Sequence, residues 1–254
     1  MYTMSRSLIK AIKLLDCFKD KLEMTLYELV EESNLPKTTV FRLVSSLEEA
    51  GLLVKVKRSS HDVKYRLGLK LLELGKRVSE QLEYRKLALP YMRELNQKLN
   101  ELVHMAVVEG DEAVYVEKLD STKPVRLVIQ IGGRSPLYAG SAPKLLLAHM
   151  NDDDRDNYLQ NIEFEKITEN TIENVEELKR ELAEIKRKGY SISQAEHYRD
   201  TMGFSYPIKD FNGETIAALG VSIPITDYSK EREEMILRET GKTAERISRE
   251  LGYW

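Results

Sequence analysis

The stretch Leu35-Pro36-Lys37-Thr38-Thr39-Val40-Phe41-Arg42-Leu43 decides the fold of the first part of the chain. Pro36 suits the first turn of a helix, because its missing N–H would have no partner there. Gly51 suits the end of the same helix. At about 100° per residue, one sector of this helix is apolar. We predict that four residues of this sector face the core: Val40, Leu43, Val44 and Leu47.

Two further helices are predicted before this one. Thr25-Leu26-Tyr27-Glu28 has the form of a capping box, which starts a helix that stops near Ser33-Asn34. An earlier amphipathic helix, starting near Ser5 or Ser7, carries Leu8, Ala11, Ile12, Leu15 and Phe18 at helical spacing. Two helices joined by a short turn, the second opened by polar residues, predict a helix-turn-helix.

The face of the third helix opposite its apolar sector is polar and carries no carboxylate before Glu48 and Glu49. A recognition helix places such a face against base edges and phosphates, which acidic residues would repel. The predicted DNA contacts on this helix are Lys37, Thr38, Thr39, Arg42 and Ser45. Phe41 could touch a thymine methyl or pack under a neighbouring loop, and we favour packing.

A basic β-hairpin is predicted directly after this helix. Leu52, Val54 and Val56 alternate with Leu53, Lys55 and Lys57, which is typical of a strand. Residues 58–62 indicate a turn, and residues 63–67 a second strand. The alternative is a solvated hairpin that is basic by chance, but its position after a helix-turn-helix favours a wing that grips phosphates. The predicted phosphate contacts are Lys55, Lys57, Arg58 and Lys64.

Composition and charge support two parts with different partners. The 254 residues suggest two domains. The net charge is −3, but residues 1–85 hold 16 basic and 12 acidic residues, so the rest of the chain is acidic. No apolar run approaches the roughly 18 residues that span a bilayer, and the N-terminus has no signal-peptide pattern. The single Cys17 excludes an internal disulfide and a Cys-built zinc site. We therefore expect a cytoplasmic protein without membrane contact.

The remainder of the chain predicts an α+β domain with a largely antiparallel sheet. Strands are expected over 102–108, 113–116, 125–131, 202–208 and 214–223, and helices over 90–100, 141–150, 175–188 and 228–251. Asn212-Gly213 gives a strong hairpin signal. The four histidines are scattered and no metalloprotease motif occurs, so we expect no catalytic residues, no metal site and no cofactor.

Three blocks carry a resemblance to a known family. Ser5-Arg6-Ser7, residues 35–43, and Tyr65-Arg66-Leu67-Gly68 followed by Leu71-Leu72-Glu73-Leu74-Gly75 are similar to the IclR family of bacterial transcription regulators, and the Tyr-Arg-Leu-Gly block is the most specific. The resemblance covers the whole chain. It implies a winged helix-turn-helix DNA-binding domain over 1–68, a linker helix over 69–86 and a GAF-like effector-binding domain over 87–254. It also implies homodimers that pair further into tetramers.

The same resemblance extends to an effector pocket. Residues 136–148 are similar to the family's loop and helix over that pocket, and residues 193–208 and 213–222 to its other wall. Carried over by motif, the lining residues are Ser141, Ala142, Ser193, Gly203, Gly220 and Ser222. The family pattern implies a small organic acid as effector. The family often has an acidic residue at the position of Ser193 and a polar side chain at the positions of Gly203 and Gly220. Because these groups are missing here, a less charged ligand would fit the pocket better.

The sequence therefore predicts a sequence-specific DNA-binding regulator, a repressor, whose affinity for a double-stranded operator depends on a small-molecule effector. Two alternatives stay open. One is a small-molecule enzyme or sensor with a winged-helix docking domain, and the other is a protein-interaction module in which the winged domain binds a partner protein.

Overall fold

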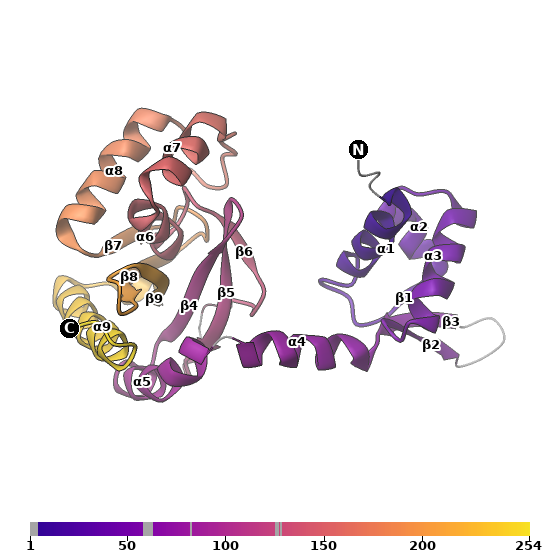
Figure 1. Cartoon of the computed structure of the whole chain (residues 1–254), viewed down its shortest axis with the longest axis horizontal. Coiled ribbons are helices and arrows are strands. Elements are labelled where there is room, and N and C mark those ends of the chain that lie inside the picture. Colours follow the sequence, from indigo (N-terminus) through magenta and orange to yellow (C-terminus); the bar gives the residue numbers. More distant parts are fainter. Residues whose placement is uncertain (1–4, 58–62, 82, 125–126, 128) are drawn as a thin grey trace. The chain divides into compact units, whose positions relative to one another are not determined.

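The computed structural model describes residues 5–57, 63–81, 83–124, 127 and 129–254 (Figure 1). By its contacts the chain divides into two compact units, Met1–Leu82 and Glu83–Trp254. The predicted linker over 69–86 falls across this division, in the helices α4 (Leu69–Gln81) and α5 (Glu83–Leu99). The predicted domain boundaries stay a prediction: a DNA-binding domain over 1–68, a linker helix over 69–86 and an effector-binding domain over 87–254.

The first unit is a winged helix-turn-helix, as predicted. Its helices are α1 (Arg6–Asp16), α2 (Leu26–Ser33), α3 (Lys37–Glu49) and α4, and its strands are β1 (Met24–Thr25), β2 (Leu53–Lys57) and β3 (Val63–Leu67). The strands form an antiparallel sheet in the order β1-β3-β2. The predicted capping box is present, because the Thr25 hydroxyl accepts from the Glu28 N–H and the Glu28 carboxylate accepts from the Thr25 N–H.

Helix α1 and the turn after it bury only part of the predicted apolar set, because Ala11 and Phe18 are buried and Leu15 is half-buried, but Leu8 and Ile12 are not. Leu14 is fully buried, with Ala11 and Phe18 beside it, whereas Leu8 and Ile12 are 63% and 48% exposed. The spacing of α1 is compatible with burial of either side, because apolar residues occur on both sides of the helix. The core of this unit therefore includes the side of α1 with Ala11 and Leu14, and it leaves Leu8 and Ile12 in solvent.

The second unit has six antiparallel strands in the order β6-β5-β4-β9-β8-β7. They are β4 (Leu102–Glu109), β5 (Glu112–Leu119), β6 (Arg134–Pro136), β7 (Ser191–Gln194), β8 (Thr201–Lys209) and β9 (Thr215–Pro224). The predicted hairpin at Asn212-Gly213 joins β8 to β9, and Gly213 has φ 81°. The strand predicted over 125–131 is wrong at residues 127 and 129–131, which are outside any strand, and residues 125, 126 and 128 lie outside the described residues.

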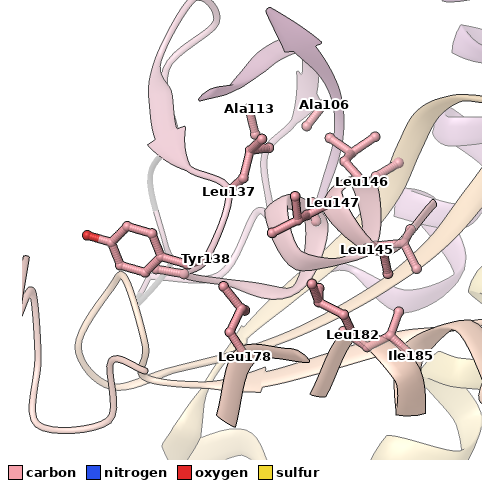
Figure 2. Packing of buried hydrophobic residues seen from close by; sticks show 14 of the residues in the cluster. Ala106, Ala113, Leu137, Tyr138, Leu145, Leu146, Leu147, Leu178, Leu182 and Ile185 are labelled. Carbon is pink, nitrogen blue, oxygen red and sulfur yellow. The ribbon is translucent and has the colours of Figure 1, made fainter. Parts of the chain in front are cut away.

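Helices cover both faces of this sheet (Figure 1). On one face lie α6 (Ser141–His149), α7 (Asp152–Asn161) and α8 (Val175–Lys188), and on the other lie α5 and α9 (Lys230–Glu250), which follows the short 3₁₀ helix η1 (Ile225–Asp227). Figure 2 shows Leu145 and Leu147 of α6 facing Leu178, Leu182 and Ile185 of α8 in the first of these cores. Helix α6 is buried almost entirely, so it is fixed between the sheet and α8. No helix in the described part of the chain is long and apolar enough to cross a membrane.

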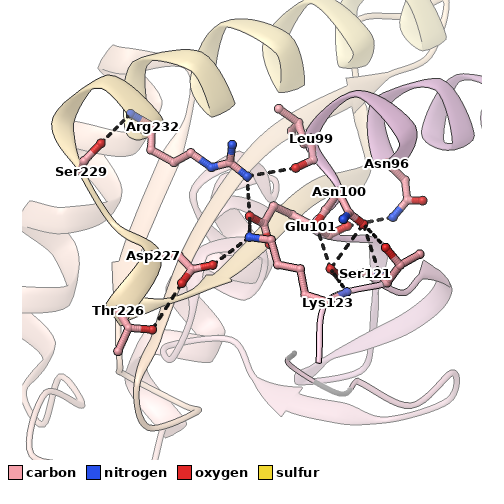
Figure 3. A network of polar contacts seen from close by, with 11 residues as sticks. Asn96, Leu99, Asn100, Glu101, Ser121, Lys123, Thr226, Asp227, Ser229 and Arg232 are labelled. Atoms are coloured by element: carbon pink, nitrogen blue, oxygen red, sulfur yellow. Dashed lines mark hydrogen bonds and ion pairs between the residues drawn. The ribbon is translucent and has the colours of Figure 1, made fainter. Parts of the chain in front are cut away.

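A buried carboxylate ties the start of β4 to two distant segments (Figure 3). Glu101 forms ion pairs with Lys123, at 2.6 Å, and with Arg232 at the start of α9. Lys123 also pairs with Asp227 of η1, at 2.7 Å. A buried charge is tolerated only with such partners. These contacts hold the segment after β5 against the start of α9.

Candidate functional site

The polar face of α3 is exposed as predicted. Val40, Val44 and Leu47 are buried in the core and Leu43 is half-buried, which fixes the orientation of the helix. The opposite face therefore presents its side chains to solvent: Lys37, Thr38, Arg42 and Ser45 are exposed and Thr39 is half-buried. The first turn carries no acidic residue. The positive N-terminal end of the helix dipole is therefore not offset by a carboxylate, which suits a phosphate.

Phe41 does not pack under a loop, and that prediction is wrong. Its side chain is 56% exposed. The core of this unit is filled by α1, α2 and the buried side of α3, so the flank that carries Phe41 stays in solvent. Contact with a thymine methyl is the alternative that remains open.

The basic residues of the hairpin β2–β3 are divided between its two faces. Residues directly opposite each other on paired strands share a face, and the pairs here include Lys55 with Tyr65 and Val56 with Lys64. Lys55 and Lys57 therefore lie on one face of the hairpin, together with the buried residues Leu53 and Tyr65. Lys64 lies on the opposite face. Arg58 lies outside the described residues. The hairpin is a cationic ribbon on which Lys55 and Lys57 are exposed and Lys64 is half-buried.

The candidate effector residues come together through the register of the large sheet. Ser193 of β7 is opposite Gly203 of β8, and Gly203 is opposite Ser222 of β9. These three residues form one row across three neighbouring strands, on one face. Ser141 begins α6 above this row, and its Oγ lies 2.9 Å from the Oγ of Ser205.

Gly203 is a glycine because other side chains fill the space beside it. A Cβ at this position would lie 2.6 Å from the Oγ of Ser141 and 3.0 Å from the Oγ of Ser193. Real Cβ atoms do not approach that closely. Because Gly203 has no side chain, the hydroxyls of Ser141 and Ser193 can lie close to its backbone.

Gly220 has the same role for His104. A Cβ at Gly220 would lie 2.1 Å from the Cε1 of the His104 ring, which packs on the glycine from the opposite strand, β4. The ring is 2% exposed, meets the Tyr115 ring edge-on, and places Nε2 3.1 Å from the Oγ of Ser222. Burial lowers the pKa of His104 to about 4, so the ring is neutral at neutral pH.

A buried ion pair closes the other side of the site. Lys144 of α6 is 1% exposed, and its Nζ lies 2.7 Å from Glu196 and 2.9 Å from Glu181. The second carboxylate oxygen of Glu196 accepts from the Gly140 N–H, at the start of α6. Burial is the larger effect on Glu196 and raises its pKa, against the opposing effect of Lys144. Glu196 is therefore bonded to the backbone directly before α6, and α6 itself has no side-chain cap among the described residues.

A small cavity of about 30 Å³ lies at the centre of these residues. Of the six predicted residues, Ser141, Ser193, Gly203 and Ser222 line it, while Ala142 is packed in the core and Gly220 lies under His104. Four further lining residues, Glu196, His197, Tyr198 and Thr201, belong to the stretch 193–208 that resembles a pocket wall, although they were not singled out. The sequence did not indicate His104, Tyr115 and Ile129. A second cavity, of about 250 Å³, shares Ile129, Tyr198, Thr201 and Ser222 with it and adds Arg199.

Known proteins resemble both units. Residues 7–57 match a sequence model of the IclR helix-turn-helix domain, and residues 76–249 match one of the C-terminal part of bacterial IclR transcriptional regulators. The HTH-type transcriptional regulator KipR of Bacillus subtilis is 36% identical over the full length of both chains.

Two solved structures of similar length share the fold. The IclR of Thermotoga maritima is 29% identical, with a TM-score of 0.79, and the match covers 97% of this chain and 99% of that one. An IclR homolog from Microbacterium hydrocarbonoxydans, complexed with 4-hydroxybenzoate, is 30% identical, with a TM-score of 0.77, over 96% of this chain and 99% of that one.

Proposed function

The chain belongs to the IclR family of bacterial transcriptional regulators, and from this premise we propose how its two units divide the work. It is a DNA-binding transcriptional regulator, and its relatives are regulators rather than enzymes. We propose that the winged unit binds an operator, that the second unit binds an effector, and that the protein represses its targets. Its place of action is then the cytoplasm, where the bacterial chromosome lies.

Helix α3 enters the major groove in this proposal. Arg42 donates two hydrogen bonds to a guanine, Lys37 and Ser45 contact the backbone, and Thr38 and Thr39 contact bases or phosphates. The lysines of β2 and β3, Lys55, Lys57 and Lys64, together with Arg58, neutralise phosphates beside the groove. One observation carries this proposal: the exposed face of α3, free of carboxylates along its first turns, is followed in the chain by a cationic ribbon.

A gel-shift assay tests this function. The full chain is titrated against fragments of its own chromosomal neighbourhood and against scrambled duplexes, at low and at physiological salt. We expect one fragment to be bound in preference to the scrambled duplexes at both salt concentrations. Binding that is equal on all duplexes and vanishes with salt would leave only a non-specific electrostatic contact.

Two exposed apolar surfaces in the first unit support a homodimer. Large apolar side chains are exposed on α1 and on α4: Leu8, Ile9, Ile12, Leu69, Leu72 and Leu74. Apolar residues gathered on a helix surface indicate a surface that another chain covers. One helix-turn-helix reads only a half-site, so a dimer also suits specific recognition. We propose that the chain forms dimers, and that dimers pair into tetramers.

The two cavities that share Ile129, Tyr198, Thr201 and Ser222 form the proposed effector site. The small cavity, of about 30 Å³, has room only for a polar end group of the effector, with Ser141, Ser193 and Ser222 as hydrogen-bonding residues. Support comes from the row of small residues that opens this space and from the homolog complexed with 4-hydroxybenzoate. The family resemblance implies a small organic acid, and the arrangement of Glu196 supports the less charged alternative. The effector would shift the equilibrium between two arrangements of the DNA-binding units by its different affinity for each.

A further inference from the structure

Two buried imidazole nitrogens at the cavity have no hydrogen-bond partner in the described part of the chain. They are Nδ1 of His104 and Nδ1 of His197, and both side chains line the cavity. Buried polar atoms in folded proteins are satisfied in the great majority of cases, and each exception needs an explanation. His104 is held by Ser222 through its other nitrogen, so its free nitrogen is fixed in place.

The buried lysine beside the cavity is already paired with carboxylates of the protein. Glu196 accepts from the N–H of Gly140, directly before the first turn of α6, and it also pairs with Lys144. A second pairing of Lys144, with Glu181, leaves this group of charges negative. An anion placed here would meet a carboxylate rather than a free cation.

The cation at the neighbouring cavity is Arg199. It is exposed, and it belongs to the larger of the two cavities and not to the one that the histidines line. Arg199 lines the larger cavity and not the small one, whereas His104 lines the small one and not the larger. The two locations can therefore be separated by experiment.

We propose that the effector is an uncharged molecule with an amide-like group that both donates and accepts hydrogen bonds, and that His104 and His197 read this group. The inference rests on the proposed function, since it names the ligand class of the same site. A neutral imidazole has one donor and one acceptor nitrogen, and the partner of Nε2 decides which role Nδ1 takes. An amide can satisfy either role. The low pKa of His104 agrees with a ring that stays neutral when the ligand binds.

Matched pairs of amides and acids test the proposed ligand class. The full chain is titrated calorimetrically with 4-hydroxybenzamide and 4-hydroxybenzoate, and with lactamide and lactate, which differ mainly in charge. We expect at least one amide to bind, and to bind at least tenfold more tightly than its acid. Tighter binding of the acid, weakened by Arg199→Ala, would place a carboxylate at the arginine and overturn the proposal. Failure of both amides to bind would overturn it as well.

Substitution of His104 tests its role. His104→Phe keeps a ring over Gly220 and against Tyr115 but removes both nitrogens, so we expect amide affinity to fall about tenfold. His149→Phe is the matched control, because His149 is a partly buried histidine that lines neither cavity. Unchanged amide affinity in a folded His104→Phe variant would overturn the assignment.

A measurement on the unaltered protein covers the case in which this variant does not fold. In the chain labelled with ¹⁵N-histidine, we expect the bound amide to shift the Nδ1 resonances of His104 and His197 and to leave that of His149 in place. Resonances that do not move would overturn the assignment. Gel-shift on the unliganded protein is independent of all these results, so DNA binding without amide binding would refute this inference and leave the proposed function standing.

Discussion

Arg42 is exposed in the middle of α3 and has no ion-pair partner in the described part of the chain. If it reads a guanine, Arg42→Ala should weaken operator binding by about 1–3 kcal/mol and relax specificity at one base position. Arg42→Lys keeps the charge but cannot form the two-pronged contact, so it should lose specificity with little change in salt dependence. Fluorescence anisotropy on the operator and its single-base variants measures both effects.

A matched control comes from α8, where the exposed Arg180→Ala should leave DNA binding unchanged. Equal losses on operator and scrambled duplex for Arg42→Ala would assign Arg42 to phosphate contact instead of base recognition.

His104 should make the protein sensitive to acid. Its pKa in the folded chain, about 4, lies below the ordinary value of 6.5, so the unfolded chain binds the proton more readily. The stability from the neutral ring is complete above about pH 6.5 and is lost as the pH falls toward about 4. Urea unfolding across this range should show a steeper loss of stability for the wild type than for His104→Phe.

The comparison isolates His104, because His149 and His197, whose pKa values burial also lowers, remain in both proteins. Parallel pH profiles for the two proteins would contradict the expectation.

For single residues, the sequence alone predicted those orientations that depend on local periodicity. The face of α3 that carries Arg42 follows from the apolar sector on its other side, and the structure bears this out. His104 could not be predicted in the same way, since its neighbours Gly220 and Ser222 are more than a hundred positions away and meet it only through the pairing of β4 with β9. Phe41 was predicted wrongly because an apolar side chain on a helix flank does not reveal whether a loop covers it.

The ribbon β2–β3 acts through charge rather than base contacts in this account. Lys55→Ala and Lys57→Ala should each weaken binding to operator and scrambled duplexes alike. Each should also reduce the slope of log affinity against log salt by about 0.9, the value for one lost phosphate contact. Titrations at several salt concentrations measure the slope, with Lys179→Ala on α8 as the control.

An unchanged salt slope in both variants would mean that the hairpin is merely solvated. The register of β2 with β3 adds that Lys64, on the other face, contributes separately from Lys55 and Lys57.

Helix α6 depends on the ion pair between Lys144 and Glu196. Lys144→Met leaves a buried carboxylate without its partner, which should destabilise the second unit by about 3–5 kcal/mol. The double variant Lys144→Met with Glu196→Gln removes both charges and should recover part of that loss. Chemical denaturation of the three proteins gives the free energies of unfolding, and a double variant no more stable than Lys144→Met would contradict this role of the pair.

Among the elements, those with strong local signals were predicted best. The capping box at Thr25 and the hairpin at Asn212-Gly213 depend on adjacent residues, and both are present. Leu8 and Ile12 of α1 are exposed although they belong to the predicted apolar set, because its apolar residues permit two faces and only packing against α2 and α3 selects one. The strand predicted over 125–131 failed where the chain is described, because an apolar stretch does not by itself supply a pairing partner.

At the scale of the whole molecule, the proposed assembly depends on the apolar residues that α1 and α4 leave exposed. Leu8 and Ile12 on α1, and Leu69 and Leu72 on α4, are the residues that a partner chain would bury. Leu8→Glu together with Leu72→Glu should shift the protein from dimer toward monomer and weaken operator binding at least tenfold, because a single half-site is left. Sedimentation velocity measures the assembly.

Phe211→Glu, an equally exposed apolar position in the hairpin β8–β9, serves as the control and should leave the sedimentation unchanged. A dimer that survives the paired glutamates would place the interface elsewhere.

The central claim is that α3 and the β2–β3 ribbon contact duplex DNA twice in each assembly. Sedimentation of a labelled operator duplex with increasing amounts of the full chain, in dilute salt, tests this most directly. We expect saturation at two chains per duplex, or at four where two dimers bind together. Saturation at one chain per duplex, or no binding to any duplex even in dilute salt, would contradict the central claim.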